Sequence, residues 1–334
     1  MSQDRILMSH GAGGLKTYQL IKEIFHKHFA NPILTRELDA GLFPGTPGRW
    51  AMTTDSFVVK PLFFPGGDIG KLSVCGTVND LAVSGAKPLY LTSSFILEEG
   101  LPLIDLEKIV ASMAHTAREA GVQIVAGDTK VVEKGSGDGV FITTTGLGLV
   151  PGEIDYSPQH IQPGDKVIIS GPLGQHGLTI MAARGNLPVT SSLVSDCACL
   201  HELLNPLHSP EIRCMRDPTR GGLATTLNEL ALQSGLGILL EEGAIPRDPA
   251  VEGLADLLGL DSLYLANEGK AVVIASPQAA PRVLAQLRNH PLGRQTSLIG
   301  EVTGEAAGQV LLQTDLGTKR VLRMPAGELL PRIC

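Results

Sequence analysis

The sequence predicts a mixed α and β fold of the α/β (α+β) type, arranged in two domains. Short apolar runs rich in Val, Ile and Thr alternate with longer segments in which apolar residues recur at helical spacing. The 334 residues are enough for two domains of ordinary size, each with its own core. Pro and Gly residues cluster over residues 151–165 between two strand-like runs, which predicts the boundary between the domains there.

In the first half, apolar stripes predict helices over residues 15–29 and 106–120, the second ending at Gly121. A further helix is expected over residues 70–84. The predicted strands of this half cover residues 50–54, 89–96, 122–126 and 140–150.

The second half is expected to begin at Val167. It is predicted to contain a helix over residues 223–233 and strands near Ile238, near Leu263 and over residues 271–275. A hairpin of residues 310–314 and 319–324 follows, turning at Asp315-Leu316-Gly317. Past Pro325 no periodicity remains, so the last ten residues are expected to form an arm that spans roughly 30 Å when extended.

Composition excludes several classes of protein. Hydrophobic residues make up 43% and charged residues 18%, which excludes a disordered chain. The net charge of -7 and the aromatic content of 4% argue against a nucleic-acid partner. No apolar stretch is long enough for a membrane span, and the N-terminal residues lack a basic and then apolar leader pattern, so we expect a cytoplasmic protein with no membrane contact.

The five cysteines have no disulfide-framework spacing and are expected to be reduced. Cys197, Cys199 and His201 have a spacing that suggests a zinc site, with Cys214 further along. However, a helix is expected over residues 192–204, and residues two apart on a helix point in nearly opposite directions. Core cysteines are therefore the preferred interpretation.

Cys334 is the terminal residue of the chain, where packing does not explain it. Arg332 lies close in sequence, and reactive thiols sit in exposed positions near positive charge. Such a thiol on an arm is typical of a carrier. A frayed terminus explains the tail equally well when it is considered alone.

Three aspartates stand where acidic ligands commonly enter α/β sites. Asp55 and Asp128 are expected directly at the ends of strands, and Asp80 follows Asn79 inside a helix, where both residue types are unfavourable unless something polar rewards them. Carboxylate oxygens suit Mg²⁺, which completes its coordination with water and nucleotide phosphates. A turn cap would explain Asp55 alone.

Gly-rich loops that lead into helices are typical of phosphate sites. One covers residues 9–14 and is followed by Lys16, and another covers residues 216–222. A third polar loop, residues 267–270, lies between two predicted strands. A mobile N-terminal loop and two ordinary turns are the alternatives, but the combination with the acidic residues favours an ATP-dependent enzyme over a binding module.

Taken together, these motifs resemble those of the HypE family of hydrogenase maturation factors, within the superfamily named for aminoimidazole ribonucleotide synthetase. The matching blocks span nearly the whole chain and are Gly11-Ala12-Gly13-Gly14, Thr54-Asp55-Ser56, Phe64-Pro65-Gly66-Gly67-Asp68-Ile69-Gly70, Gly76-Thr77-Val78-Asn79-Asp80-Leu81-Ala82, Gly127-Asp128-Thr129-Lys130-Val131-Val132, Asp217-Pro218-Thr219-Arg220-Gly221-Gly222, Asn267-Glu268-Gly269-Lys270 and Pro331-Arg332-Ile333-Cys334. The acidic and Gly-rich blocks mark the superfamily, and the terminal block marks HypE.

The resemblance implies a two-domain fold with mixed sheets. Residues 1–155 would form an ATP-binding and dimerisation domain, residues 160–310 a second α/β domain, and residues 311–334 a hairpin and flexible tail. It further implies a homodimer, a carbamoyltransferase partner HypF that loads the tail thiol, and a HypC–HypD scaffold that receives the cyano group.

The implied activity is an ATP-dependent dehydration of a thiocarbamate on Cys334 to a thiocyanate, which supplies cyanide ligands for the iron of [NiFe]-hydrogenases. Glu268 is expected to be the base, and Lys130 to stabilise charge or assist proton transfer, a simple phosphate contact being nearly as plausible. Asp55, Asp80 and Asp128 would hold Mg²⁺. The expected ATP and phosphate ligands are Gly11, Gly13, Gly14, Lys16, Asn79, Thr129 and Asp217.

Two alternatives to this activity are open. A selenophosphate synthetase would need a reactive Cys in the N-terminal Gly-rich loop, whereas the first Cys here is Cys75, inside a predicted helix. From another class, a scaffold would bind nucleotide and only present its tail. In the enzyme, Ile333 is expected to anchor the docked tail.

Overall fold

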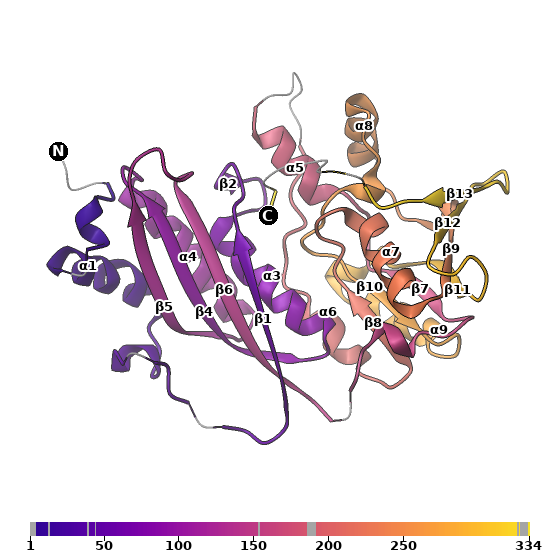
Figure 1. Cartoon of the computed structure of the whole chain (residues 1–334), viewed down its shortest axis with the longest axis horizontal. Helices are drawn as coiled ribbons and strands as arrows, with labels where there is room; N and C mark the ends of the chain where they lie inside the picture. The colour runs from indigo at the N-terminus through magenta and orange to yellow at the C-terminus, as the bar shows by residue number, and fades with distance from the viewer. Residues whose placement is uncertain are drawn as a thin grey trace.

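The chain folds into two α/β halves that lie side by side, in a computed structural model of the whole sequence (Figure 1). The structure describes residues 5–12, 14–38, 40–43, 45–152, 154–185, 192–325, 327, 333 and 334. In this part of the chain, no helix has both the length and the apolar character that a membrane crossing requires.

The first half contains a four-stranded sheet in the order β1-β6-β4-β5. Its strands are β1 (Arg49–Phe57), β4 (Lys87–Glu98), β5 (Gln123–Val132) and β6 (Val140–Val150). β6 is antiparallel to both neighbours, and β4 is parallel to β5. Burial alternates along β6, which is the pattern of a sheet covered on one face only.

Helices α3 (Ile69–Val83) and α4 (Leu103–Glu119) cover the buried face of this sheet (Figure 1). Asp68 caps α3 by accepting a hydrogen bond of 2.7 Å from the Gly70 N–H. Gly70 allows the two helices to pack closely, because a Cβ there would lie 2.2 Å from the Ile109 carbonyl oxygen. Before the cap, β2 (Phe63–Phe64) and β3 (Gly67–Asp68) form a short hairpin.

The helix predicted over residues 15–29 is confirmed, and its middle is a π-helical segment. It consists of α1 (Leu15–Leu20), η2 (Ile21–His26) and α2 (Lys27–Phe29), flanked by the 3₁₀ turns η1 (Met8–His10) and η3 (Leu34–Arg36). The stretch packs against α4 through Phe25 and Phe29, which are buried.

The second half contains a mixed seven-stranded sheet in the order β13-β12-β9-β11-β7-β10-β8. Its strands are β7 (Lys166–Ile169), β8 (Ile212–Arg216), β9 (Gly237–Glu241), β10 (Val272–Ala275), β11 (Ser297–Thr303), β12 (Val310–Gln313) and β13 (Lys319–Leu322). The predicted terminal hairpin is confirmed as β12 and β13. Two separate apolar cores flank the sheet, as expected for a sheet covered on both faces.

The helices of the second half are α5 (Gln175–Ala183), α6 (His201–Leu204), α7 (Gly222–Ser234), α8 (Pro249–Leu258) and α9 (Ala280–Arg288), with 3₁₀ turns η4 (Pro158–His160), η5 (Asn205–Leu207), η6 (Glu242–Ala244), η7 (Ser262–Tyr264) and η8 (Pro291–Gly293). α7 packs on one core, and α6 and α9 on the other. α5 and α8 instead extend the core of the first half.

Two sequence predictions in the second half are wrong. The strand expected near Leu263 is the 3₁₀ turn η7. The helix expected over residues 192–204 is limited to α6, and residues 192–200 follow an irregular path. This path is fixed by tertiary contacts, because the Asn79 side chain accepts a hydrogen bond of 2.8 Å from the Leu200 N–H.

The irregular path also changes the geometry of the cysteines. Cys197 and Cys199 both approach Cys75 of α3, and the Sγ atoms of Cys199 and Cys75 lie 3.6 Å apart. No helix therefore separates the two thiols, contrary to the prediction from the sequence. Nevertheless, no group of three or more His, Cys, Asp and Glu side chains within the described residues is arranged to hold a metal ion. Contact with the other thiols and burial raise the pKa of Cys75 well above its ordinary value, so the Cys75 thiol is neutral.

Candidate functional site

A small acidic pocket of about 50 Å³ lies where the two halves meet the C-terminal end of the chain. It combines β1, α3, the loop before α7 and the loop before β10. Its lining residues are Asp55, Ser56, Phe57, Gly76, Asp80, Asp217, Thr219, Arg220, Glu268 and Cys334. Residues more than 200 positions apart in the sequence therefore form one site.

Asp55 and Asp80 form a carboxyl pair in this pocket. Asp55 lies inside β1 rather than at its end, and Asp80 projects from the C-terminal half of α3. Burial and the neighbouring Asp80 raise the pKa of Asp55 to about 6. The Thr53 hydroxyl donates a hydrogen bond of 2.6 Å to Asp80 Oδ2. The Asp55 carboxyl therefore takes up a proton at higher pH than an ordinary aspartate does.

Asp217 and Glu268 add two buried carboxyl groups. Burial, with Asp80 nearby, raises the pKa of Asp217 to about 7. Burial and the neighbouring Asp217 raise the pKa of Glu268 well above its ordinary value, and Glu268 Oε1 has no hydrogen-bond partner among the described residues. Arg220 is the cation that faces these acids. Such a concentration of perturbed acids indicates a reactive or ligand-binding site.

Asn79 fixes the backbone around Glu268. Its amide donates to the carbonyl oxygens of Ala198 and Glu268, at 3.1 and 3.2 Å, and its oxygen accepts from Leu200. The side chain is buried and fully engaged, so Asn79 contacts the backbone and not the pocket. The sequence predicts a nucleotide ligand at this position, whereas in the structure the side chain is bonded to backbone groups of residues 198, 200 and 268.

Asn267 performs a similar task on the other side of Glu268. Its amide donates to the carbonyl oxygen of Pro218 at 3.0 Å, and its oxygen accepts from the Gly174 N–H at 2.7 Å. The loops that carry Asp217 and Glu268 are thereby held to each other and to the start of α5.

Cys334 closes the acidic pocket from the C-terminal side. Ile333, only 5% exposed, belongs to the apolar core of the first half. Burial, followed by the charge of Glu268, raises the pKa of the Cys334 thiol to about 12. In this position the thiol is neutral and is a poor nucleophile.

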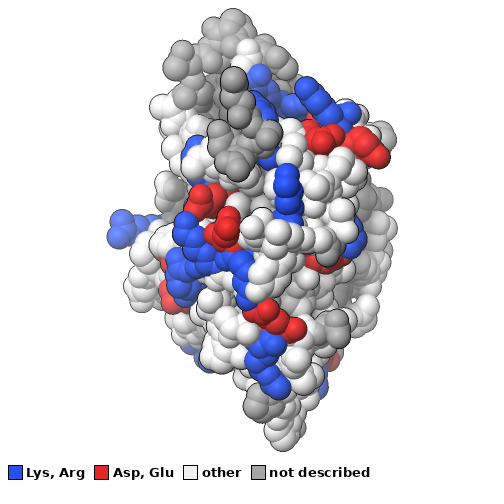
Figure 2. All heavy atoms as spheres, turned by 90° about the vertical axis from the view of Figure 1, so that its left-hand side faces the viewer, with Lys and Arg blue, Asp and Glu red and all other residues white. Residues whose placement is uncertain are grey.

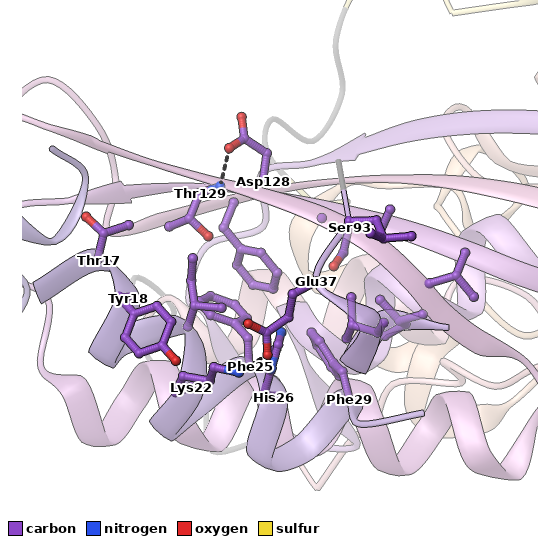
Figure 3. A pocket seen from close by; sticks show the side chains of 18 of the residues that line it. Thr17, Tyr18, Lys22, Phe25, His26, Phe29, Glu37, Ser93, Asp128 and Thr129 are labelled. Carbon is purple, nitrogen blue, oxygen red and sulfur yellow. Dashed lines mark hydrogen bonds and ion pairs between the residues drawn. The ribbon is translucent and has the colours of Figure 1, made fainter. Parts of the chain in front are cut away.

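A second, larger pocket of about 460 Å³ lies between the N-terminal helical stretch and β5 (Figure 3). Aromatic side chains such as Phe25 and Tyr18 line it, together with Gly11 and Thr129. Gly11 approaches β5 so closely that a Cβ would lie 2.8 Å from the Val131 backbone nitrogen. The volume is within the range of small-molecule sites.

Asp128 and Lys130 lie apart from the acidic pocket within the chain. Figure 3 shows Thr129 directed toward the large pocket and Asp128 directed away from it. Asp128 forms an ion pair of 3.1 Å with Lys130, and both side chains are more than half exposed. Asp55 is on the first strand of the sheet and Asp128 on the last, about 14 Å apart at ordinary strand spacing.

The strand register also puts these two acids on opposite faces of the sheet. Paired residues on neighbouring strands point to the same face of a sheet. Asp128 is in register with Ser94, Thr143 and Ser56. Asp55 is in register with Thr144, which is buried against α3. One chain therefore brings Asp55 and Asp80 together, but not Asp128.

The other predicted phosphate ligands have mixed positions. Gly14 is the N-cap residue of α1, and Lys16 is exposed in the first turn of that helix. Gly13 lies outside the described residues, as do Pro331 and Arg332 and most of the expected mobile tail. Acidic and basic side chains are interspersed on the face of the molecule that Figure 2 presents, the side on which α1 lies in Figure 1.

Four residues without a predicted role lie in the site or support it in the structure, namely Arg220, Asn267, Asp196 and His176. Arg220 and Asn267 belong to recognised motif blocks, so a signal for them was present. His176 follows a Gly-rich turn, and only its contact with the C-terminal end reveals it.

Comparison with known proteins decides the family. A family model described as AIR synthase related protein, N-terminal domain, matches residues 38–150, and the corresponding C-terminal domain model matches residues 162–313. Carbamoyl dehydratase HypE of Cupriavidus necator is 54% identical over 99% of this chain and 95% of its own length. The chain belongs to the HypE family. HypE of Escherichia coli is 49% identical over 99% of this chain and 100% of its own.

Solved HypE structures have the same two-domain fold, that of aminoimidazole ribonucleotide synthetase relatives. Hydrogenase maturation protein HypE in complex with ATP has a TM-score of 0.94 at 48% identity, covering 98% of this chain and 99% of that one. HypE in a HypE–HypF complex has a TM-score of 0.81 at 47% identity, covering 92% and 99%. A thiamine-monophosphate kinase, 19% identical with a TM-score of 0.66, shares the fold alone. The predicted family and fold class are confirmed.

Proposed function

We propose that this protein is a carbamoyl dehydratase that uses ATP to convert an S-carbamoyl group on Cys334 into a thiocyanate, for the cyanide ligands of a [NiFe]-hydrogenase. One observation carries the proposal: the C-terminal Cys334 lies in a pocket with Glu268 and three further carboxyl groups. Its HypE relatives are named carbamoyl dehydratases, and one HypE has been solved with ATP.

The reaction removes the elements of water from the carbamoyl group. Transfer of the ATP γ-phosphoryl group to the carbamoyl oxygen makes that oxygen a leaving group, and loss of both N–H protons as phosphate departs forms the C≡N bond. The products are the thiocyanate, ADP and inorganic phosphate. Glu268 is the proposed base, since its buried carboxyl has a raised pKa and an oxygen without a partner among the described residues.

The docked pocket suits a carbamoylated tail better than a free thiolate. The neighbouring carboxyl groups repel a second negative charge, and the pKa of docked Cys334 is about 12. The S-carbamoyl group is neutral and avoids this penalty. Loading by HypF therefore takes place with the tail undocked, where the thiol ionises more easily, and dehydration takes place after docking.

We propose that ATP binds with its nucleoside part in the 460 Å³ pocket, because the acidic pocket of about 50 Å³ is too small for a nucleotide. Burial, followed by the charge of Asp80, raises the pKa values of Asp55 and Asp217. These clustered carboxylates fit a Mg²⁺ ion that is held largely by phosphate oxygens and water. Asp55 and Asp80, with Asp128, are the proposed holders. The ion would neutralise phosphate charge.

A homodimer would resolve the separation of Lys130 and Asp128 from the acidic pocket. The outer face of the β1-β6-β4-β5 sheet carries no covering helix from the described part of the chain, and Met52 and Ile96 are exposed on it. We propose that two copies pair through this face, so that Lys130 and Asp128 of one copy reach the acidic pocket of the other past the edge strand β1 and complete it.

The proposed partners are HypF, which accompanies a HypE relative in a solved complex, and a HypC–HypD scaffold that receives the cyano group. We place the reaction in the cytoplasm. A scaffold that only presents its tail is the competing interpretation.

The test is mass spectrometry of the C-terminal peptide after carbamoylation by HypF and addition of Mg·ATP. We expect the peptide to lose one water only when ATP is present. Carbamoylated peptide that binds ATP without losing water would support the scaffold. A Cys334→Ala chain, which accepts no carbamoyl group but should still bind ATP, is the control.

A further inference from the structure

His176 connects the core of the protein to the C-terminal residues. It lies in the first turn of α5, is 0% exposed, and packs edge-on against Phe64 with ring centroids 5.6 Å apart. Its Nε2 lies 2.6 Å from the Ile333 carbonyl oxygen, and its Nδ1 lies 2.8 Å from the Ser195 hydroxyl. This is a buried side chain that contacts the residue next to Cys334.

The partners determine where the imidazole carries its proton. A carbonyl oxygen only accepts, so Nε2 must donate its hydrogen to Ile333. The neutral ring then has an accepting Nδ1, which receives the Ser195 hydroxyl hydrogen. The Ser195 Oγ in turn accepts from the Cys197 N–H at 3.1 Å. The hydrogen bonds form one consistent chain from the backbone of residue 197 to the tail.

The same segment holds the proposed base. Asp196, next to Ser195, accepts the backbone N–H groups of Glu268 and Gly269 through its two carboxylate oxygens, each at 3.2 Å. It also forms a buried ion pair of 3.2 Å with Lys270. Ser195 therefore holds the tail through His176. The adjacent Asp196 holds the proposed base through the backbone N–H of Glu268.

We propose that His176 is the positioning residue that latches the docked tail, with Ser195 selecting its tautomer, so that the carbamoyl group on Cys334 lies against Glu268. The purpose of the latch, which is to place the carbamoyl group against Glu268, rests on the proposed function. The latch itself is a claim about docking and can be measured without any carbamoyl group.

The experiment measures the rate at which iodoacetamide alkylates Cys334 in the full chain, by mass spectrometry of the C-terminal peptide. Replacing the ring donor by His176→Phe should raise this rate about fivefold to tenfold, as expected for one lost hydrogen bond. His176→Gln, whose amide keeps a donor near the Nε2 position, should stay within about twofold of the unmodified chain. His208→Phe, at a ring that packs near Tyr156, is the matched control and should change nothing.

Ser195→Ala provides a second variant in case the Phe chain fails to fold, which far-UV circular dichroism and ATP binding would reveal. It should raise the alkylation rate about twofold to fivefold, because the ring loses the partner that selects its tautomer. An unchanged rate in folded His176→Phe and Ser195→Ala chains would overturn the latch. So would a Gln chain alkylated as fast as the Phe chain, since that result indicates only lost packing.

Dehydration is then followed in a single turnover of the carbamoylated chain with ATP. His176→Phe should slow it by a smaller factor than alkylation rises, because alkylation follows the undocked fraction of the tail and dehydration follows the docked fraction. His176→Gln should restore it. If the unmodified carbamoylated chain loses no water, the proposed function fails while the alkylation result still decides the latch. If water loss is normal but alkylation is insensitive to His176, only the latch fails.

Discussion

Glu268 has the environment that a base for this dehydration requires: it is buried, close to other acids and, among the described residues, without a partner at Oε1. Replacing it by Gln keeps the shape of the side chain and removes the basic oxygen. We expect Glu268→Gln to slow water loss by about 10²- to 10⁴-fold in single turnover, with ATP binding preserved. Glu202→Gln, in α6, is the control. Dehydration at the normal rate in Glu268→Gln would assign the base elsewhere.

The acid cluster predicts how Mg²⁺ binding depends on pH. The pKa of Asp55 is raised to about 6 and that of Asp217 to about 7, so both lose their protons between about pH 5 and pH 8. Mg²⁺ binds the ionised forms and competes with the protons. Its apparent affinity in the presence of ATP should therefore rise with pH across this window and fall as the carboxyl groups protonate.

Isothermal titration calorimetry in buffers of different ionisation enthalpy measures this directly. We expect proton release on Mg²⁺ binding near about pH 6.5, between the two raised pKa values, and Asp55→Asn should reduce it. Binding without proton release would mean that the ion does not contact these carboxylates.

At the scale of elements, the packing of α3 against α4 holds Asp80 and Asn79 in place. Gly70→Ala would put a Cβ 2.2 Å from the Ile109 carbonyl oxygen, so the helices must separate. We expect a loss of about 1–3 kcal/mol in the free energy of unfolding, measured with urea. Gly253→Ala in α8 is the matched control, because no atom lies within 4 Å of its Cβ. That change should stabilise the protein by about 0.5–1 kcal/mol. Equal effects of the two substitutions would contradict the packing account.

Periodicity predicted most elements of the first half, because its helices have one apolar stripe and its sheet alternates along the strands. Residues 192–200 were mispredicted for a physical reason. Their polar backbone groups are satisfied by Asn79 and Pro65, which are distant in the sequence, so local pattern carries no information about them.

At the scale of the whole molecule, motif chemistry identified the acids of the site but not their grouping. Asp55, Asp80, Asp217 and Glu268 meet in one pocket, whereas the motifs group Asp55 and Asp80 with Asp128. The register of four strands, which no local pattern reveals, separates Asp128 from them. Likewise, the contact between His176 and Ile333 joins residues 157 positions apart.

The dimer proposal predicts complementation between inactive chains. Lys130→Ala and Glu268→Gln chains should each be nearly inactive alone. When they are co-expressed, half of the dimers are mixed and each has one intact site, so activity should recover to roughly a quarter of normal. Asp55 and Glu268 line the same pocket of one chain, so Asp55→Asn with Glu268→Gln should stay inactive and is the control. No recovery in the first mixture would mean that Lys130 acts within its own chain or not at all.

The central claim is that ATP phosphorylates the oxygen of the carbamoyl group on Cys334. The most direct test labels that oxygen with ¹⁸O, adds Mg·ATP for a single turnover, and analyses the inorganic phosphate by mass spectrometry. The account predicts one ¹⁸O atom in each phosphate formed, together with a thiocyanate on the tail. Thiocyanate formation with unlabelled phosphate would contradict it.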